Sequence, residues 1–445
     1  MNIILLSGGS GKRLWPLSNE IRSKQFIKIL KKNDSSYESM VERVYRQIRS
    51  VDNQANVLIA TSESQVPMIK NQLGDNINIS IEPCRKDTFP AIVLACLYLK
   101  CVKGIDENET VVVSPVDPYV DDDFFDSLKK LDNKMKNSKN NIGLVGITPT
   151  YPSEKYGYIV VNKNREDLSV EKFVEKPKEQ EAKKLIFNGA LWNGGVFCFK
   201  LKYVINKAHE ILDFKDYDGF YKKYDTFPTI SFDYAVVEKE NNIDVIKYDG
   251  EWKDIGTWNT LSEVMNDKTL GNVIMDKTCE NVNVINELNI PIITMGLKDA
   301  IVAASHDGIF VSDKYESSFN KPLVEQIDNR PMYEERAWGD FQVLDIYKKS
   351  LVKHIYIKKG KSISYQKHQY RDEVWTIVDG KGVLLLNDKC KIVKCGDVLT
   401  INMNEKHALK ALTDLHFIEV QIGEELMEND IERFEFNWDI NNSFM

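Results

Sequence analysis

A glycine-rich turn follows the first apolar run of the chain, and it limits the fold more than any other feature. The apolar run, residues 3–6, predicts a short buried strand over residues 2–6. The turn after it contains Gly8, Gly9, Gly11, Lys12 and Arg13. Glycines let a backbone approach a polyphosphate closely and aim its N–H groups at it. The sequence therefore predicts a phosphate-binding turn, with an ordinary strand–turn–helix bearing surface cations as the alternative.

The spacing of these residues excludes two common phosphate loops. A Walker loop reads GxxxxGK[ST], but here the glycines stand too close together and Arg13 occupies the position of the magnesium-binding hydroxyl. A Rossmann fingerprint reads GxGxxG, and its third glycine, counted from Gly9 and Gly11, would fall at Leu14. A further cation, Lys24, follows the turn. The turn thus belongs to another class of phosphate site.

The stretch around the turn resembles the signature of the sugar-1-phosphate nucleotidyltransferases. Residues 8–26 read GGSGKRLWPLSNEIRSKQF. The mannose-1-phosphate guanylyltransferase branch of that family has roughly GGxGxRLWPLS followed by KQF. Asn19 stands where that branch usually has Arg, and Ser23 where it usually has Pro; neither position carries the phosphate chemistry. The resemblance implies that an NTP and a sugar-1-phosphate give an NDP-sugar and pyrophosphate.

Short apolar strands alternate with helical patterns in the first half of the chain. Buried strands are predicted at 56–62, 109–117 and 141–147, and a helix at 90–100. This alternation predicts an α/β domain with a mostly parallel sheet over residues 1–265. The resemblance implies a Rossmann-like domain with a mixed sheet.

Two further regions follow this domain. Short strand signals at near-regular spacing predict a small β unit, or part of a β-solenoid, over 266–330. A charged stretch, 325–336, is typical of a linker. Alternating strands with glycine turns then predict an all-β barrel or jelly roll. Residues 337–438 resemble the cupin half of bifunctional guanylyltransferase and phosphomannose isomerase proteins.

Composition excludes several classes of partner. The chain has 445 residues, which predicts two or three domains, and its net charge of −8 argues against nucleic acid or an anionic membrane. Its apolar runs are too short for a membrane-spanning helix, which needs roughly 18 residues. The seven scattered cysteines lack zinc-site spacing and indicate a reducing cytoplasm. We expect small-molecule substrates and a homo-oligomer, most simply a dimer.

Nucleotidyl transfer depends on positioning and charge neutralisation, so the site needs cations for phosphates and carboxylates for Mg²⁺. The resemblance implies Arg13 and Lys24 as the catalytic cations, and Asp117 and Asp254 as the magnesium ligands. On residue type alone, Asp117 could instead cap a helix, and Asp254, between Trp252 and Trp258, could be structural. The nucleotide-binding residues that we expect are Leu6, Gly8, Gly9, Gly11, Lys12, Glu82 and Asp87.

Other segments resemble the sugar-binding parts of the family. KYGYI (155–159), KFVEKP (172–177), LWNGGVF (191–197) and SFDYAVVEK (231–239) occur in the family's order. They imply sugar contacts from Gly157, Glu175, Lys176, Asn193 and Asp233.

The base-binding segment departs from the family pattern. IEPCRKDTFPAI (81–92) resembles EPxGRNTAPAI, but Lys86 and Asp87 occupy its Arg-Asn positions. Guanine presents N–H donors, so it needs an acceptor such as Asp87 or backbone carbonyls. GTP, and hence GDP-mannose for polysaccharide biosynthesis, is the favoured interpretation. Another base or sugar-1-phosphate is an alternative.

The cupin-like region carries a reduced metal motif. His368, Glu373 and His407 are candidate ligands for a divalent transition metal, with packing as the alternative. The resemblance implies that Tyr370 and Val374 replace two histidines of the isomerase pattern. We therefore expect no interconversion of mannose-6-phosphate and fructose-6-phosphate at a useful rate, and a barrel that supports assembly or senses product. A bifunctional enzyme and a binding protein without turnover are the rival hypotheses.

Overall fold

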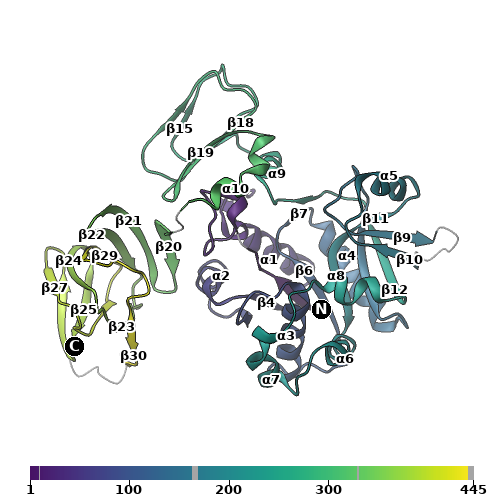
Figure 1. Cartoon of the computed structure of the whole chain (residues 1–445), viewed down its shortest axis with the longest axis horizontal. Helices are drawn as coiled ribbons and strands as arrows, with labels where there is room; N and C mark the ends of the chain where they lie inside the picture. The colour runs from purple at the N-terminus through teal and green to yellow at the C-terminus, as the bar shows by residue number, and fades with distance from the viewer. Residues whose placement is uncertain (10, 163–168, 328–329, 439–445) are drawn as a thin grey trace. The chain divides into compact units, whose positions relative to one another are not determined.

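The computed structural model describes residues 1–9, 11–162, 169–327 and 330–438 (Figure 1). Over these residues the chain forms two compact units. The first consists of residues 1–14, 22–268 and 314–321, and the second of residues 15–21, 269–313 and the chain from 322 onward. Residues 314–321 therefore return to the first unit after an excursion into the second.

One large mixed sheet forms the centre of the first unit. Its strand order is β5 (Asn78–Glu82), β4 (Asn56–Ser62), β1 (Asn2–Leu6), β6 (Thr110–Pro115), β11 (Leu191–Lys200), β8 (Ile142–Ile147), β12 (Ile243–Tyr248), β10 (Ser169–Val174) and β9 (Tyr158–Asn162). β1 pairs in parallel with β4 and β6, whereas β11 is antiparallel to β6 and β8. The predicted α/β fold with a mostly parallel mixed sheet is confirmed.

Four helices pack directly against strands of this sheet: α3 (Thr88–Cys101), α4 (Asp123–Asn137), α5 (Glu179–Phe187) and α6 (Leu201–Ile211) (Figure 1). The other helices of this unit are α1 (Met40–Val51), α2 (Val66–Leu73), α7 (Tyr217–Lys222), α8 (Phe232–Ala235) and α9 (Trp258–Val264). The strands predicted at 56–62, 109–117 and 141–147, and the helix at 90–100, all form, with bounds that differ by at most two residues.

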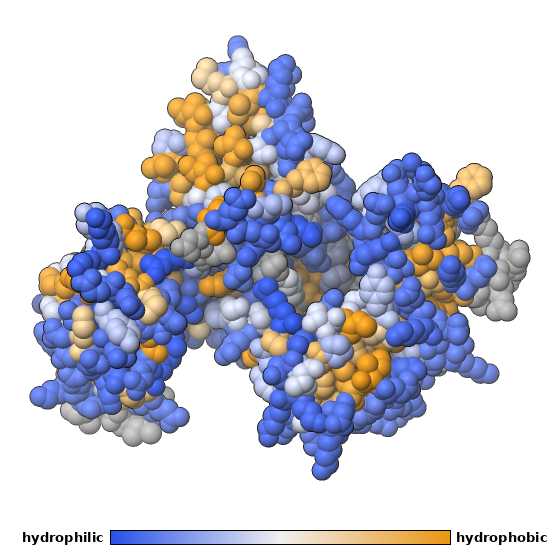
Figure 2. Space-filling model, viewed as in Figure 1, coloured by the Kyte–Doolittle hydropathy of each residue, from blue (hydrophilic) through white to orange (hydrophobic). Residues whose placement is uncertain are grey.

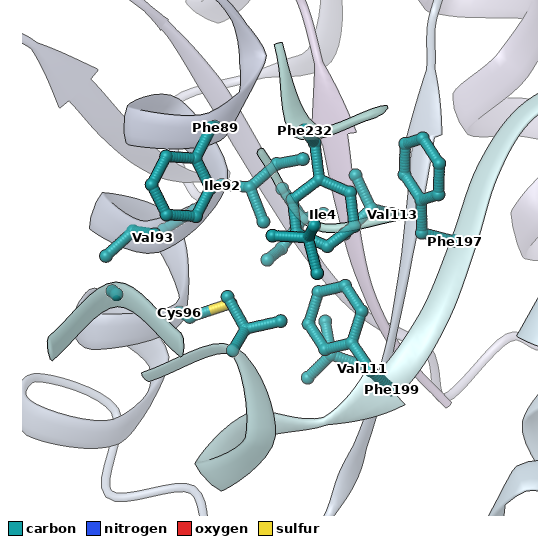
Figure 3. Packing of buried hydrophobic residues seen from close by; sticks show 14 of the residues in the cluster. Ile4, Phe89, Ile92, Val93, Cys96, Val111, Val113, Phe197, Phe199 and Phe232 are labelled. Atoms are coloured by element: carbon teal, nitrogen blue, oxygen red, sulfur yellow. The ribbon is translucent and has the colours of Figure 1, made fainter. Parts of the chain in front are cut away.

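The core of this unit lies between α3 and the sheet (Figure 3). α3 is apolar around most of its circumference, which is typical of a buried helix. Phe232 of α8 packs against Phe197 and Phe199 of β11, with ring centroids 4.8 and 5.6 Å apart. This packing fixes the ends of β1 and β6, where the glycine turn and Asp117 begin.

A small two-stranded sheet lies beside the large one. β7 (Pro118–Val120) pairs antiparallel with β13 (Trp252–Asp254), and Asp254 stands opposite Pro118. The pairing brings Asp254 next to Asp117, although 136 residues separate them in sequence.

Residues 269–313 of the second unit form parallel coils. β14 (Thr269–Leu270), β16 (Asn283–Asn286) and β18 (Ala300–Ser305) stack in parallel, as do β15 (Val273–Met275) and β17 (Ile292–Thr294). β19 (Gly308–Asp313) returns antiparallel to β18. The stacked coils have the geometry of a short β-solenoid around a small apolar core.

The second unit ends in two antiparallel sheets that pack face to face. One has the order β20 (Tyr333–Arg336), β21 (Gly339–Tyr347), β22 (Ser350–Ile357), β29 (Leu415–Gly423), β24 (Arg371–Asp379) and β27 (Val398–Ile401). The other has the order β26 (Lys389–Lys394), β25 (Lys381–Leu386), β28 (His407–Ala411), β23 (Tyr365–Lys367) and β30 (Glu432–Phe434). Buried and exposed residues alternate along β22 and β24, and the predicted all-β barrel is confirmed.

The stretch predicted as a linker, 325–336, ends in strand β20, and its residues 328–329 lie outside the described residues. The proposed domain limits at 265, 330 and 337 remain predictions. No helix in the described part of the chain is long and apolar enough to cross a membrane.

Candidate functional site

The glycine turn follows β1 and leads into the short helix η1 (Lys12–Leu14). Gly9 has a φ of +121°, a conformation that side chains rarely adopt, so glycine is required there. Its carbonyl accepts a hydrogen bond of 3.0 Å from the Ser23 hydroxyl. Ser23 immediately precedes Lys24, so this contact ties the turn to the chain segment that carries a predicted catalytic cation.

A buried polar network lies behind the turn, and the sequence analysis missed it. Gln65 donates a hydrogen bond of 2.7 Å to the Ser23 hydroxyl. The Gln65 carbonyl oxygen accepts from Thr61 at 2.9 Å and from Gln25 at 3.4 Å. Gln25 also donates to the Ser7 hydroxyl at 3.2 Å. All five side chains are buried, and such satisfied networks hold a backbone in one conformation.

A cavity of about 290 Å³ lies in front of the turn. It is lined by Gly8, Gly9, Gly11, Lys12, Arg13, Leu14, Lys24, Gln25, Asp117, Gly256 and Lys321. Glycine backbone and several cationic side chains therefore line one space, which suits a polyphosphate. The predicted residues Arg13, Lys24 and Asp117 all line it, and Lys321 was not predicted.

Lys24 lies between the two carboxylates that were predicted to bind metal. Its ammonium Nζ is 2.8 Å from Asp117 Oδ2 and 3.6 Å from Asp254 Oδ1. It also donates to the carbonyl of Ile255 at 3.0 Å. The two carboxylates thus flank one positive charge at the edge of the cavity.

These charges stabilise one another. Burial acts to lower the pKa of Lys24, but the carboxylates of Asp117 and Asp254 outweigh it and raise that pKa above its usual range. Burial acts to raise the pKa of the Asp117 carboxyl, but the Lys24 ammonium outweighs burial and lowers that pKa. Near neutral pH both groups are charged.

A second cavity of about 510 Å³ adjoins the turn and shares Gly8, Gly9 and Asp117 with the first. Its lining includes three predicted nucleotide-binding residues, Leu6, Glu82 and Asp87. Glu82 accepts a hydrogen bond of 2.9 Å from the Tyr224 hydroxyl, and burial raises its pKa. The cavity is large enough for a nucleoside.

Asp87 has a more constrained part in this cavity than the sequence indicated. It is the N-cap of α3, has a φ of +66°, and accepts a hydrogen bond of 2.7 Å from the Thr88 N–H. One carboxylate oxygen is therefore committed to the helix. Glu82 and Asp117 are the other carboxylates that line this cavity, and Asp117 is paired with Lys24.

The predicted sugar-binding residues lie in or next to strands β9, β10 and β11 and helix α8. Asn193 donates a hydrogen bond of 2.7 Å to Asp233 Oδ1, and its N–H donates to the Gly157 carbonyl at 2.8 Å. Glu175 forms an ion pair of 2.7 Å with Lys176. Hydrogen bonds thus link Asn193 to both Gly157 and Asp233, and the other two predicted residues form an ion pair.

Gly157 and Glu175 lie in close contact. A Cβ at position 157 would come within 2.5 Å of Glu175 Oε2, so a larger residue would displace that carboxylate. Oε2 is buried and has no hydrogen-bond partner among the described residues. Burial, followed by the nearby charge of Glu175, raises the pKa of Asp233 to about 6. The cluster therefore offers carboxylate acceptors beside one cation.

Three aromatic rings connect the predicted metal-binding residues with the predicted sugar-binding residues. Tyr156 packs against Trp192 and Trp252, with ring centroids 5.0 and 5.3 Å apart. Each ring lies one or two residues before a predicted site residue, namely Gly157, Asn193 and Asp254. The packing of these rings fixes the spacing between the two groups of side chains.

A separate constellation lies inside the barrel. His368 Nε2 is 3.2 Å from Glu373 Oε1, and His407 Nε2 is 3.6 Å from Glu373 Oε2. These ligand atoms all lie within 4.8 Å of one another, and the three residues are buried. The sequence analysis predicted this trio, and the fold brings it together from three strand ends.

The histidines are oriented as metal ligands usually are. His368 Nδ1 faces the Asp430 carbonyl, and His407 Nδ1 lies 2.9 Å from the Glu405 carbonyl. Burial lowers the pKa of both imidazoles. Neutral rings that donate from Nδ1 present the Nε2 lone pairs to Glu373. His407 Nε2 is buried and has no hydrogen bond among the described residues.

Arg371 is a member of this constellation that the sequence analysis did not single out. Its Nε donates to Glu373 Oε1 at 3.0 Å, and its Nη2 is 3.3 Å from His368 Nε2. Burial acts to raise the pKa of Glu373, but the buried groups around this carboxylate, the Arg371 guanidinium among them, hold that pKa below its usual range. A cation already balances the carboxylate.

The two positions that depart from the isomerase pattern are not equivalent. β24 alternates faces, so Val374 points away from its neighbour Glu373 and is not a ligand position. Tyr370 is 44% exposed and lines an outer cavity of about 510 Å³. Of the two departures, Tyr370 is the one that bears on the chemistry.

Comparison with known proteins agrees with this geometry. The family model for nucleotidyl transferases matches residues 2–270. The model for the C-terminal region of mannose-6-phosphate isomerase matches residues 326–436. The two matches divide the chain as the sequence resemblance does.

Relatives and a solved structure extend the likeness over the chain. The mannose-1-phosphate guanylyltransferase of Salmonella montevideo is 30% identical, over 97% of this chain and 98% of its own length. The alginate biosynthesis protein AlgA of Pseudomonas aeruginosa is 30% identical over 97% of this chain and 96% of its own. A crystal structure described as mannose-1-phosphate geranyltransferase from Thermus thermophilus has a TM-score of 0.59 at 25% identity. It covers 73% of this chain and 98% of that one.

Proposed function

Because the chain belongs to the nucleotidyl transferase family, we propose that it makes GDP-mannose and pyrophosphate from GTP and mannose-1-phosphate. The observation that carries this proposal is the convergence of Arg13, Lys24 and Asp117 on one cavity at the glycine turn. The printed names of the relatives supply the sugar and the base.

The reaction exchanges one phosphorus–oxygen bond for another. An oxygen of the sugar-1-phosphate attacks the α-phosphorus of the NTP, and the bond from that phosphorus to the bridging oxygen breaks. Pyrophosphate leaves with the electron pair, and the chain need not supply a nucleophile. The residues act by alignment and by charge neutralisation on the leaving phosphates, which is the role we assign to Arg13 and Lys12.

Nucleotidyltransferases of this family use a divalent metal, and we assign Mg²⁺ to Asp117 and Asp254. The two residues fit the ion because their carboxylates already flank a cation, the Lys24 ammonium. Mg²⁺ is commonly held by one or two carboxylates together with substrate phosphates. When bound, it would neutralise charge on the reacting phosphates, while Lys24 would remain beside the carboxylates and orient them.

Glu82, with Asp87, is our candidate for the acceptor that reads guanine. A carboxylate can accept both N–H groups of the guanine edge, and the Tyr224 hydroxyl fixes one side of Glu82. Gly157, Glu175, Lys176, Asn193 and Asp233 are proposed to bind the sugar phosphate. The buried, unpartnered oxygen of Glu175 supports this assignment, since a sugar hydroxyl could satisfy it.

We assign a structural or ligand-binding role to the barrel rather than isomerase activity. His368, Glu373 and His407 fit a divalent transition metal, since their ligand atoms lie close together and His407 Nε2 is buried without a hydrogen bond among the described residues. Tyr370, exposed at the outer cavity, does not replace the missing imidazole. Arg371 takes up part of the Glu373 charge that a catalytic ion would use.

We further propose a homodimer in the cytoplasm. Apolar side chains gather on the exposed surface of the solenoid, where Ile274, Ile293 and Met295 are more than half exposed (Figure 2). Exposed apolar groups of this kind often mark a protein interface. Every cysteine of the described residues is a free thiol, which supports a reducing compartment.

The direct test is product analysis. The purified protein, incubated with GTP, mannose-1-phosphate and Mg²⁺, should release equal amounts of GDP-mannose and pyrophosphate. If a nucleotide sugar with another base forms, the assignment of guanine as the base is wrong. Absence of any nucleotide sugar would reject the function.

A further inference from the structure

A segment beyond the matched nucleotidyl transferase region takes part in the phosphate cavity. The family model ends at residue 270, yet Lys321 lines the cavity in front of the glycine turn. The segment 314–321 belongs to the same compact unit as the turn. Its short helix η6 (Glu316–Phe319) packs against α9, which places Asn320 and Lys321 at the turn.

Asn320 attaches this segment to the turn by a buried contact. Its side chain is 4% exposed, and its Nδ2 donates a hydrogen bond of 3.1 Å to the carbonyl of Arg13. Its Oδ1 is also buried and has no hydrogen bond among the described residues. A buried amide that holds the main chain of Arg13 fixes where the guanidinium can reach.

The charges in the cavity call for another cation. Lys24 is balanced by Asp117 and Asp254, so little of its charge is left for the leaving phosphates. The triphosphate of an NTP carries more negative charge than the proposed Mg²⁺ neutralises, so cations of the protein must share the remainder. Lys321 lines the same cavity and carries a positive charge.

We infer that Lys321 binds the leaving phosphates of the NTP and that Asn320 positions Arg13 for the same task. This inference rests on the proposed function. It assigns to the active site two residues that lie about 300 positions after the glycine turn in the sequence.

Equilibrium binding separates this role from a general effect on the fold. Titration calorimetry with Mg²⁺ would compare GTP, inorganic pyrophosphate and GMP as ligands. Lys321→Ala should lower the affinity for GTP and for pyrophosphate about tenfold, which is the loss expected for one charged hydrogen bond. The affinity for GMP should not change. Lys321→Arg should restore most of the affinity. Lys314→Ala removes the same charge from the same segment outside the cavity lining, and should bind GTP as the wild type does.

Asn320→Leu keeps the size of the side chain and removes the donor to the Arg13 carbonyl without adding a charge. This variant should bind GTP more weakly than the wild type does. In an Arg13→Ala background it should change GTP affinity little, because Asn320 acts on GTP through Arg13. A purely structural role would give the same loss in both backgrounds.

The inference is overturned if Lys321→Ala binds GTP and pyrophosphate as tightly as the wild type does. It is also overturned if the affinity for GMP falls by the same factor as the affinity for GTP. Wild-type protein that binds neither GTP nor pyrophosphate overturns it as well. Binding of GTP and pyrophosphate with the predicted pattern, but without GDP-mannose synthesis, would reject the proposed function and support the inference.

Discussion

Lys24 and Asp117 form an ion pair of 2.8 Å at the edge of the phosphate cavity, with Asp254 on the other side of the ammonium. Lys24 begins the short helix η2 (Lys24–Phe26), whereas Asp117 lies between strands β6 and β7. The two residues were predicted to have different roles, Lys24 toward phosphate and Asp117 toward metal. The geometry of the pair indicates that cation and carboxylates form one electrostatic unit. Loss of one carboxylate should therefore affect both metal and phosphate binding.

Replacement of either carboxylate tests this unit. Asp117→Asn and Asp254→Asn should each lower kcat by about 10²-fold or more at saturating Mg²⁺, as loss of a preorganised charge at a reacting centre does. Steady-state rates over a magnesium series measure the effect.

Asp267→Asn is a matched control, because Asp267 pairs with Lys31 at 2.9 Å outside the cavity linings. Its rate should stay near that of the wild type. A rate for Asp254→Asn close to that of the control would remove Asp254 from the metal site.

The network behind the glycine turn should matter for turnover as well as for stability. Gln65→Leu leaves Ser23, Thr61 and Gln25 without their shared partner, which costs about 1–3 kcal/mol. We expect kcat to fall about tenfold, because Gly9 loses its support. The combined variant Ser23→Ala/Gln65→Leu should cost less than the sum of the single changes, as measured by denaturant unfolding and kcat. Full additivity would mean that the residues act separately.

Asp233 makes a pH-dependent contribution to stability. Its pKa in the folded chain is about 6, whereas an unfolded carboxyl titrates at ~3.9. Between these values the folded state holds a proton that the unfolded state has released, so stability falls as pH rises through this window. The cost is complete above about pH 6.

Asp233→Asn removes that cost and keeps an acceptor for Asn193. We expect the variant to gain on the order of 1 kcal/mol relative to the wild type at pH 8 and much less at pH 4.5. Thermal unfolding at the two pH values measures the difference. An equal gain in stability at pH 4.5 and pH 8 would contradict the titration of Asp233. The variant should have lower activity than the wild type at both pH values.

The barrel should bind metal without isomerising sugar phosphates. A neutral phenol is a poor ligand near pH 7, since its pKa is about 10. With mannose-6-phosphate and Zn²⁺, Co²⁺ or Mn²⁺, the protein should form no fructose-6-phosphate, while elemental analysis should find an ion that His407→Ala does not retain. Formation of fructose-6-phosphate that disappears in His407→Ala would restore the bifunctional hypothesis.

Local patterns were enough to predict most elements of the fold. Strand β1, the glycine turn and helix α3 follow from apolar runs and from residues that favour turns and helix starts. The barrel follows from alternating burial along strands such as β22. These signals lie within a few residues of one another, so no tertiary contact is needed to detect them.

The contacts that assemble the site could not be predicted in the same way. The pairing of Asp254 opposite Pro118, the approach of Lys321 to the turn and the Ser23–Gln65 hydrogen bond all join segments far apart in sequence. Family resemblance named many site residues but did not show that Arg371 contacts Glu373. The available signal for that contact was an Arg two residues before a predicted ligand in a strand pattern, because such residues lie on the same face of a strand.

The central claim is that this chain joins GTP to mannose-1-phosphate. Pyrophosphate release measured over a grid of NTPs and sugar-1-phosphates tests it most directly, with kcat/KM determined for every pair. The account predicts that GTP with mannose-1-phosphate has the highest kcat/KM, and that Glu82→Gln narrows its advantage over ATP. A grid in which another pair is preferred, or in which no pair releases pyrophosphate, would contradict it.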